Sequence, residues 1–223
     1  MAAGSPRPDR MKPTALSFAA AWLAVGAAIQ TPHVAVFGFD QDKAGAPPAG
    51  FTFAAMRQPA PGSWIVRRLG SNGYVAHAPD AASQGYALAV VDDVLPGDVT
   101  LAVRLRLAGG RRAGGVVWHY LDNQNYYACV LDLSRRELSM YRMAGGSRSR
   151  MEFEDDLELD ADAWHSMKVW HNGRATRVSL GGIRVFEHSR RDRDGADAGR
   201  VGLIAAGDAD VWFDDFSIDR PRN

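Results

Sequence analysis

The chain has 223 residues, of which 46% are hydrophobic, and its 26 Lys and Arg balance its 26 Asp and Glu. A chain of this length can bury one sizeable core, and a single sandwich or barrel can occupy all of it. The charge balance gives no global field for nucleic acid, and the arginine pairs at 111–112, 135–136 and 190–191 are dispersed, as turn and surface charges are.

The N-terminal region has the pattern of an export signal. Met11 and Lys12 precede a short apolar run, residues 16–28, that ends in small residues. The run is too short to span a bilayer well, and no cysteine follows it that could carry a lipid. We expect a signal peptide over residues 1–27, cleavage between 27 and 35, no stable membrane anchor afterwards, and a periplasmic or extracellular location.

From residue 34 onward, short runs alternate between apolar and polar residues and are broken by Gly, Asn, Asp and Pro. The clearest run is 98–107, in which Val and Leu at every second position predict a strand with one buried face. Residues 116–120 and 126–133 flank a polar cluster and predict a hairpin. Asn172-Gly173 predicts another tight turn, because both residues tolerate left-handed backbone.

Further strands are expected at 36–39, 63–68, 74–77, 86–91, 137–143, 183–187, 199–205 and 211–218. No helical period occurs. The only cysteine, Cys129, lies in a strand-like run and is expected to be a small buried hydrophobe. The pattern predicts one all-β domain over 34–220, a two-sheet antiparallel jelly-roll sandwich.

Three stretches carry a family resemblance: AGGVVWHYLDNQNYYACVLDL, WHSMKVWHNGRATRVSLGGIRVFEH and GRVGLIAAGDADVWFDDFSI. They resemble the concanavalin A-like jelly rolls of lectins and glucanases. The middle stretch is similar to the closing region of 3-keto-disaccharide hydrolase-like (family 16-like) domains and of laminin G-like bacterial modules. The resemblance runs over 98–218, and more loosely from 34. It implies a concanavalin A-like fold, which hosts both binding modules and hydrolases.

Catalytic carboxylates would lie at alternate positions of one strand, since retaining glycosidases need an acid and a nucleophile close together. The acidic stretch 152–160 lacks the Glu-x-Asp-x-x-Glu spacing of the glucanases, and its flanks resemble a loop. A solvated acidic connection is the simpler interpretation, so the glucanase mechanism has no support.

An aromatic groove is the better prospect, because sugar rings stack on aromatic side chains while Arg and His contact hydroxyls. Alternation places Trp118 and Tyr120 on one face, where they are interpreted as packing. The candidate ligand-binding residues are His119, Tyr127, Arg104, Arg106 and Arg142.

Metal ligands are sparse in the sequence. His165 and His171 have no evident third ligand, so packing or turn roles are favoured over zinc. The resemblance implies one structural calcium ion between the first and last strands, for which Asp40, Asp214 and Asp215 are the candidate ligands.

These patterns predict an exported protein that binds a saccharide or glycan and is not catalytic. Two alternatives stay open: a glycoside hydrolase of the 3-keto-disaccharide type, and a laminin G-like module that binds a protein partner. No cofactor other than calcium is expected, and the pattern defines neither the ligand nor the oligomeric state.

Overall fold

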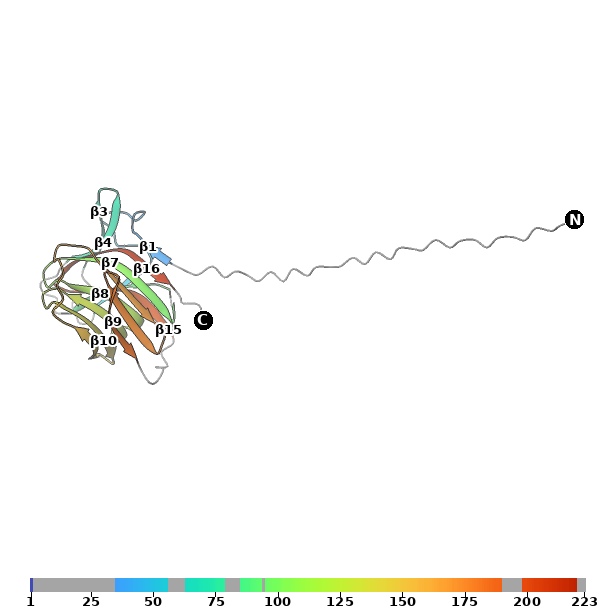
Figure 1. Cartoon of the computed structure of the whole chain (residues 1–223). Helices are drawn as coiled ribbons and strands as arrows, with labels where there is room; N and C mark the ends of the chain where they lie inside the picture. Colours follow the sequence, from blue (N-terminus) through green and yellow to red (C-terminus); the bar gives the residue numbers. More distant parts are fainter. Residues whose placement is uncertain (2–34, 56–62, 79–84, 94, 190–197, 220–223) are drawn as a thin grey trace. The chain divides into compact units, whose positions relative to one another are not determined.

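A computed structural model describes the chain at residue 1 and over residues 35–55, 63–78, 85–93, 95–189 and 198–219. The chain divides into two compact units, Met1–Thr31 and Pro32–Asn223. The strands described all lie in the second unit (Figure 1), and the predicted signal peptide lies outside the described residues. Among these residues there is no helix, and so none with the length and apolar character that crossing a membrane requires.

Sheet A contains eight antiparallel strands. Its order is β14 (Ile183–Ser189), β13 (Ala175–Leu180), β12 (His165–His171), β7 (Val99–Gly109), β16 (Asp210–Asp219), β4 (Asn72–Ala78) and β3 (Ser63–Leu69), with β1 (Ala35–Phe37) also paired to β16.

Sheet B also contains eight antiparallel strands. Its order is β11 (Ser147–Glu154), β10 (Glu137–Ala144), β9 (Asn125–Asp132), β8 (Ala113–Asp122), β15 (Ala198–Ala206), β5 (Tyr86–Val91) and β2 (Phe51–Ala55), with β6 (Leu95–Pro96) also paired to β15. The predicted all-β, two-sheet antiparallel sandwich is therefore confirmed.

The core lies between the two sheets. In β7 the alternate residues from Val99 to Leu107 are all buried, as predicted, while Arg104 between them is exposed. Sheet B approaches closely here, because a Cβ added at Gly114 would lie 2.8 Å from the side chain of Val211 in β16. Each fully buried large apolar side chain contributes about 1.5–3 kcal/mol, so this layer is the main source of stability.

Two turns show how polar residues end strands. Between β8 and β9, the Asp122 carboxylate accepts a hydrogen bond from the Gln124 backbone N–H at 2.7 Å. Between β12 and β13, the Asn172 side-chain oxygen accepts the Ala175 N–H at 2.8 Å, and Gly173 takes a φ of 73°. Both turns are held by an Asx side chain that replaces a backbone partner.

A β-bulge in β8 changes which side chains face the core. The register with β9 is interrupted between Trp118 and Asp122, and His119 takes a φ of 49°. As a result Trp118 points between the sheets, toward His171 of β12, whereas Tyr120 contacts Tyr126 on the outer face of sheet B. The prediction that Trp118 and Tyr120 share one face is wrong, because a bulge adds a residue and resets the alternation.

The prediction of a loop-like connection for the acidic stretch 152–160 is correct only in part. Its first residues belong to strand β11, which runs to Glu154, and the residues from Asp155 to Asp160 have no regular structure. Most of the acidic side chains are exposed, as predicted.

Candidate functional site

The outer face of sheet B carries a cluster of tyrosines. Tyr141 of β10 lies opposite Ala128 of β9, and Met143 lies opposite Tyr126, so Tyr126 and Tyr141 share a face. That face is the outer one, because the opposite face includes Trp118, which points toward sheet A. Tyr86, Tyr120, Tyr126 and Tyr141 form this cluster, with ring-to-ring distances of 6.0–6.5 Å.

Three arginines cover these rings. The Arg148 guanidinium lies 4.0 Å from the centroid of the Tyr141 ring, and that of Arg200 lies 5.2 Å from the Tyr120 ring. The Arg111 guanidinium lies 5.7 Å from the Tyr86 ring. Guanidinium groups are attracted to the negative face of an aromatic ring, so the rings help to hold each arginine in place. We call the four tyrosines and three arginines the Tyr-Arg face.

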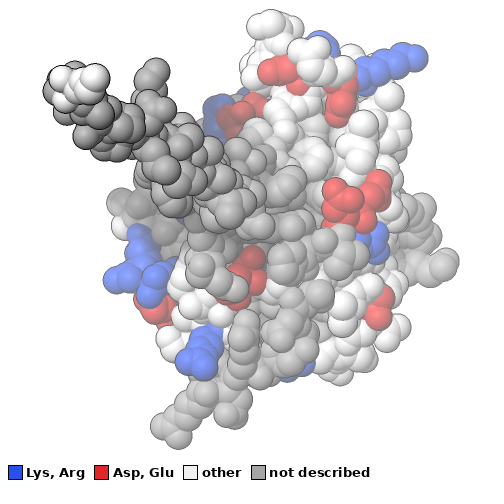
Figure 2. All heavy atoms as spheres, turned by 90° about the vertical axis from the view of Figure 1, so that its right-hand side faces the viewer, with Lys and Arg blue, Asp and Glu red and all other residues white. Residues whose placement is uncertain are grey.

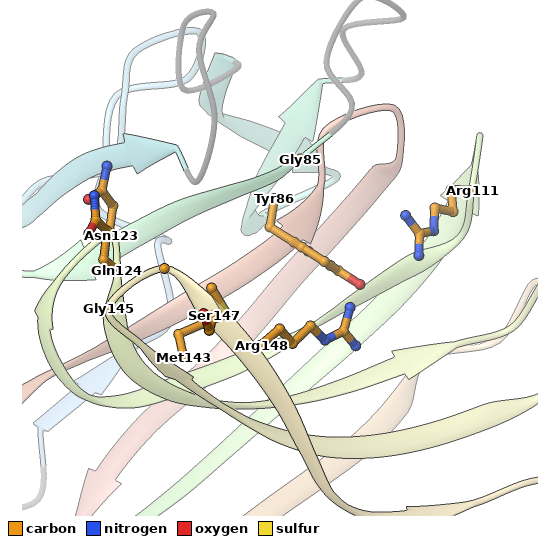
Figure 3. A pocket seen from close by; sticks show the side chains of 10 residues that line it. Gly85, Tyr86, Arg111, Asn123, Gln124, Met143, Gly145, Ser147 and Arg148 are labelled. Atoms are coloured by element: carbon orange, nitrogen blue, oxygen red, sulfur yellow. The ribbon is translucent and has the colours of Figure 1, made fainter.

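A pocket of about 480 Å³ opens at one end of this face. Figure 3 shows Tyr86 with Arg111 and Arg148 toward its hydroxyl end, and Asn123 and Gln124 on the other side. The lining consists of Gly85, Tyr86, Arg111, Asn123, Gln124, Met143, Gly145, Gly146, Ser147 and Arg148. It therefore combines an aromatic ring, two side-chain amides and two cations in a space of the size that small ligands occupy.

The turns position these polar groups. The β8–β9 turn presents Asn123 and Gln124, and the Gln124 carbonyl accepts the Gly146 N–H of the β10–β11 turn at 3.1 Å. Gly145 and Gly146 take positive φ values of 55° and 79°, which glycine adopts without strain. The two hairpin turns are thereby joined into one wall of the pocket.

The tyrosine hydroxyls are shielded from water. Burial raises the pKa of Tyr141 well above its ordinary value of 10.0, and the neighbouring Tyr126 and Tyr86 raise it further, while Arg148 opposes the rise. Burial likewise raises the pKa of Tyr126. Neither hydroxyl makes a hydrogen bond of good geometry within the described part of the chain. Both tyrosines therefore stay neutral, and they act as packing beneath Arg148.

The five predicted ligand-binding residues fall into two groups, and the structure does not bring them to one groove. His119, Tyr127 and Arg142 lie together: the His119 and Tyr127 ring centroids are 5.8 Å apart, and the Arg142 guanidinium is 5.7 Å from the Tyr127 ring. His119 and Tyr127 are only 6% and 7% exposed. His119 Nε2 lies 2.7 Å from the Gly97 carbonyl. This group is packed toward the interior, close to His171 of sheet A.

Arg104 and Arg106 lie on the outer face of the other sheet. They stack on Trp164 and Trp212, at 5.2 Å and 4.7 Å from the ring centroids, and Tyr74 stacks on Trp212 at 4.9 Å. We call Tyr74, Trp164, Trp212, Arg104 and Arg106 the Trp-Arg face. The separation arises because β7 belongs to sheet A and the next strand, β8, belongs to sheet B.

The predicted calcium ligands make contacts with protein donors. Asp40 Oδ1 accepts the Gly73 N–H at 2.6 Å, and Asp214 Oδ2 accepts the Asn72 side-chain amide at 2.9 Å. Asp215 pairs with Arg104 at 3.2 Å. The described residues contain no group of three or more His, Cys, Asp or Glu able to hold a metal ion. An arginine beside the acids and donors on their oxygens do not fit a calcium site.

The histidines that were assigned to packing do contact protein groups. His165 Nε2 lies 2.9 Å from the Asp160 carbonyl, and His171 Nδ1 lies 2.8 Å from the Thr176 hydroxyl. Cys129 is fully buried, and burial raises the pKa of its thiol. The interpretation of Cys129 as a buried hydrophobe is confirmed.

The residues that line the pocket were not predicted from the sequence. Arg111 was interpreted as a surface charge, and Asn123 and Gln124 only as turn residues. What assembles them is the contact between two turns, which alternation along a strand does not reveal.

The charged residues outside the pocket are interspersed. Figure 2 shows Lys and Arg beside Asp and Glu over the described surface of one side. Ion pairs among the described residues include Arg177 with Glu187 at 3.0 Å and Arg150 with Glu137 at 3.0 Å. Both arginines also lie over aromatic rings, Arg177 over Trp170 and Arg150 over Phe153. Arg148 differs from them because it makes no ion pair with the described residues.

The two-sheet sandwich is similar in fold to solved structures that include a carbohydrate-binding module and a protein with a galectin-like fold. The carbohydrate-binding module CBM66 from Bacillus subtilis superposes with a TM-score of 0.59 at 16% identity, covering 75% of this chain and 94% of that one. A Bacillus subtilis protein of unknown function with a galectin-like fold gives 0.56 at 11% identity, covering 76% and 89%.

A third neighbour is a larger protein. The GH43 protein BlXynB from Bacillus licheniformis gives a TM-score of 0.55 at 14% identity, covering 83% of this chain but 39% of that one. No family model and no curated protein matches the sequence. At such low identities these likenesses show the fold alone, and the activity has to be inferred from the site.

Proposed function

We propose that this chain is an exported saccharide-binding protein that is not catalytic, and that it binds its ligand in the pocket of the Tyr-Arg face. The observation that carries the proposal is the pocket lining. Tyr86, which is 6% exposed, gives the pocket an aromatic wall, and Asn123, Gln124 and the two arginines offer hydrogen bonds. Saccharide sites need this combination, because a sugar ring has one apolar face and a rim of hydroxyls.

The lining supports binding over hydrolysis. Glycoside hydrolysis ordinarily needs two carboxyl groups on either side of the scissile bond, and none of the described residues that line the pocket is Asp or Glu. The neighbours with carbohydrate-related names support the saccharide class, and the apolar N-terminal run in the sequence supports export.

The test is a glycan-array screen followed by calorimetry with the oligosaccharides that score. We expect Tyr86→Ala to weaken binding by about fivefold or more, since a contact with an aromatic side chain is worth about 1 kcal/mol or more. Trp164→Ala on the Trp-Arg face is the matched control and should bind as the parent does. A folded protein that binds no oligosaccharide would overturn the proposal.

A glycoside hydrolase of the 3-keto-disaccharide type is the second candidate, motivated by the sequence resemblance. It predicts release of glucose from 3-keto-glucosides, with loss of that activity in Arg148→Gln. A laminin G-like partner module predicts capture of a protein from the exported fraction, unaffected by Tyr86→Ala.

A further inference from the structure

The pocket of the Tyr-Arg face carries an unbalanced positive charge. Arg111 and Arg148 are its only charged lining residues in the described part of the chain. Arg111 Nε lies 3.6 Å from Asp132 Oδ2, but the same carboxylate oxygen lies 3.8 Å from Arg135 Nε. The buried Asp132 carboxylate is thus shared by two guanidinium groups, and at least one positive charge at the pocket is not neutralised.

Arg148 is the arginine best placed to use that charge. It is exposed, and it makes no ion pair with the described residues. Its guanidinium lies 4.0 Å from the Tyr141 centroid and 5.8 Å from that of Tyr86. Stacking occupies the flat faces of a guanidinium and leaves its N–H edge able to donate to a carboxylate in two parallel bonds.

Charge and neutral groups lie on different sides of the pocket. Figure 3 shows the guanidinium groups at the hydroxyl end of Tyr86, and the amides of Asn123 and Gln124 on the other side. The amides suit neutral hydroxyls, since they both donate and accept. The guanidinium groups suit an anion. A ligand that fills about 480 Å³ would therefore carry hydroxyls at one end and a negative charge at the other.

We propose that the pocket takes an acidic saccharide, with a uronate carboxylate bound at Arg148 and Arg111. This inference rests on the proposed function, because it names the class of sugar bound at the same site. A uronate combines a ring of a size that the pocket admits, hydroxyls for the amides, and a planar carboxylate for the arginines. Inorganic anions offer the charge alone and would leave the amide side without partners.

The experiment compares two ligands that differ in charge at the same ring: tetragalacturonate and its fully methyl-esterified form. By calorimetry in low salt, the acid should bind the whole protein at least about tenfold more tightly than the ester, which corresponds to one strong charge-assisted contact. The advantage should shrink as salt is added, because the pocket is open to solvent.

Two variants test whether Arg148 causes the difference in affinity between the acid and the ester. Arg148→Gln should bring the acid to the affinity of the ester while leaving the ester unchanged. Arg150→Gln is the matched control: Arg150 is on the same strand, but it pairs with Glu137 at 3.0 Å and is not in the pocket lining. It should keep the full advantage of the acid. Both positions are exposed, so both variants are expected to fold.

The outcomes separate this inference from the proposed function. Equal binding of acid and ester, or an advantage that survives Arg148→Gln, overturns the acidic class and leaves saccharide binding intact. Inorganic sulfate that competes as strongly as tetragalacturonate also overturns it, since the sugar ring would then add nothing. Failure of the folded protein to bind these and all array glycans overturns both.

Discussion

Arginine side chains stack on aromatic rings on both outer faces of the sandwich, but the two faces have different surroundings. On sheet A, Arg104 and Arg106 stack on Trp164 and Trp212. On sheet B, Arg148 stacks on Tyr141 and Arg111 lies over Tyr86. Both faces therefore place cations on aromatic rings, at distances of 4.0–5.7 Å from the centroids.

The difference lies in whether a pocket lies beside the stacked arginines. Each face has one arginine beside an acid: Arg104 lies 3.2 Å from Asp215 on sheet A, and Arg111 lies 3.6 Å from Asp132 on sheet B. Among the described residues neither Arg106 nor Arg148 makes an ion pair, but Arg106 is half-buried and its Nε is enclosed, whereas Arg148 is exposed and borders the pocket. A stacked arginine that has no acid and borders a pocket can bind an anion.

The largest expected effect comes from the strand pairing beneath the Tyr-Arg face. A Cβ at Gly115 would overlap the backbone carbonyl of Cys129 in the neighbouring strand, so Gly115→Ala must push β8 and β9 apart. We expect a loss of at least about 3 kcal/mol in unfolding free energy, measured by urea denaturation. Gly109→Ala is the control, because its Cβ would meet only Asp210 Cβ at 3.7 Å. A loss below about 1 kcal/mol for Gly115→Ala would contradict the close approach.

Removing the Trp212 ring, which lies at the centre of the Trp-Arg face, should reduce stability and leave saccharide binding unchanged. Trp212 is half-buried and contacts Tyr74, Trp164 and Arg106. Trp212→Ala is expected to lower the unfolding free energy by about 2–3 kcal/mol, somewhat less than for a fully buried Trp. Trp212→Phe keeps an aromatic surface and should recover part of this loss. If Trp212→Ala instead weakened saccharide binding and left the stability unchanged, the ligand would bind on the Trp-Arg face and the Tyr-Arg face would be structural.

High pH should weaken sheet B through its tyrosines. The folded pKa of Tyr141 and of Tyr126 is raised above the unfolded value near 10. The stability they contribute is therefore full below pH 10 and is lost as pH rises from there toward the folded pKa. We expect a loss of about 1 kcal/mol per tyrosine by pH 10.5, and Tyr141→Phe should remove its share.

The control for this prediction is the same variant at pH 7. There Tyr141→Phe removes a buried hydroxyl that lacks a good hydrogen bond, so stability should hold or rise slightly. An identical alkaline loss in the parent protein and in Tyr141→Phe would show that Tyr141 does not titrate as described.

The smallest effect should come from the acid that pairs with Arg104. Both side chains are largely exposed, at 44% for Arg104 and 57% for Asp215, and such pairs contribute about 0–1 kcal/mol. Asp215 has a φ of 49°, which Asn tolerates well. Asp215→Asn should therefore change the unfolding free energy by less than about 0.5 kcal/mol. The register of β16 against β7 shifts between Asp214 and Ser217, and a loss above about 1.5 kcal/mol would mean that this pair helps to hold that shift.

Local patterns were sufficient to predict the strands. The alternation in β7 and the polar cluster between β8 and β9 are short-range signals, and both elements lie where they were expected. The sandwich follows from many such strands without a helix, because each must bury one face against another sheet.

The site was harder to predict, for two physical reasons. The consecutive strands β7 and β8 join different sheets, so Arg104 and Arg106 are on another face from Tyr127. Which sheet a strand joins depends on contacts between residues far apart in the sequence. The positive φ at His119 resets the alternation within β8, and the strand-like pattern around His119 does not indicate where such a bulge falls. Arg111 lies in a turn, where no period applies, and Arg148 lies at the start of β11.

Hydrogen–deuterium exchange with and without tetragalacturonate locates the ligand on one of the two faces. We expect slower exchange at residues 85–88 and 143–148, which include Tyr86 and Arg148, and no change around Trp164 and Trp212. Protection confined to residues 104–106 and 210–215, or protection nowhere, would mean that the Tyr-Arg face does not bind the saccharide.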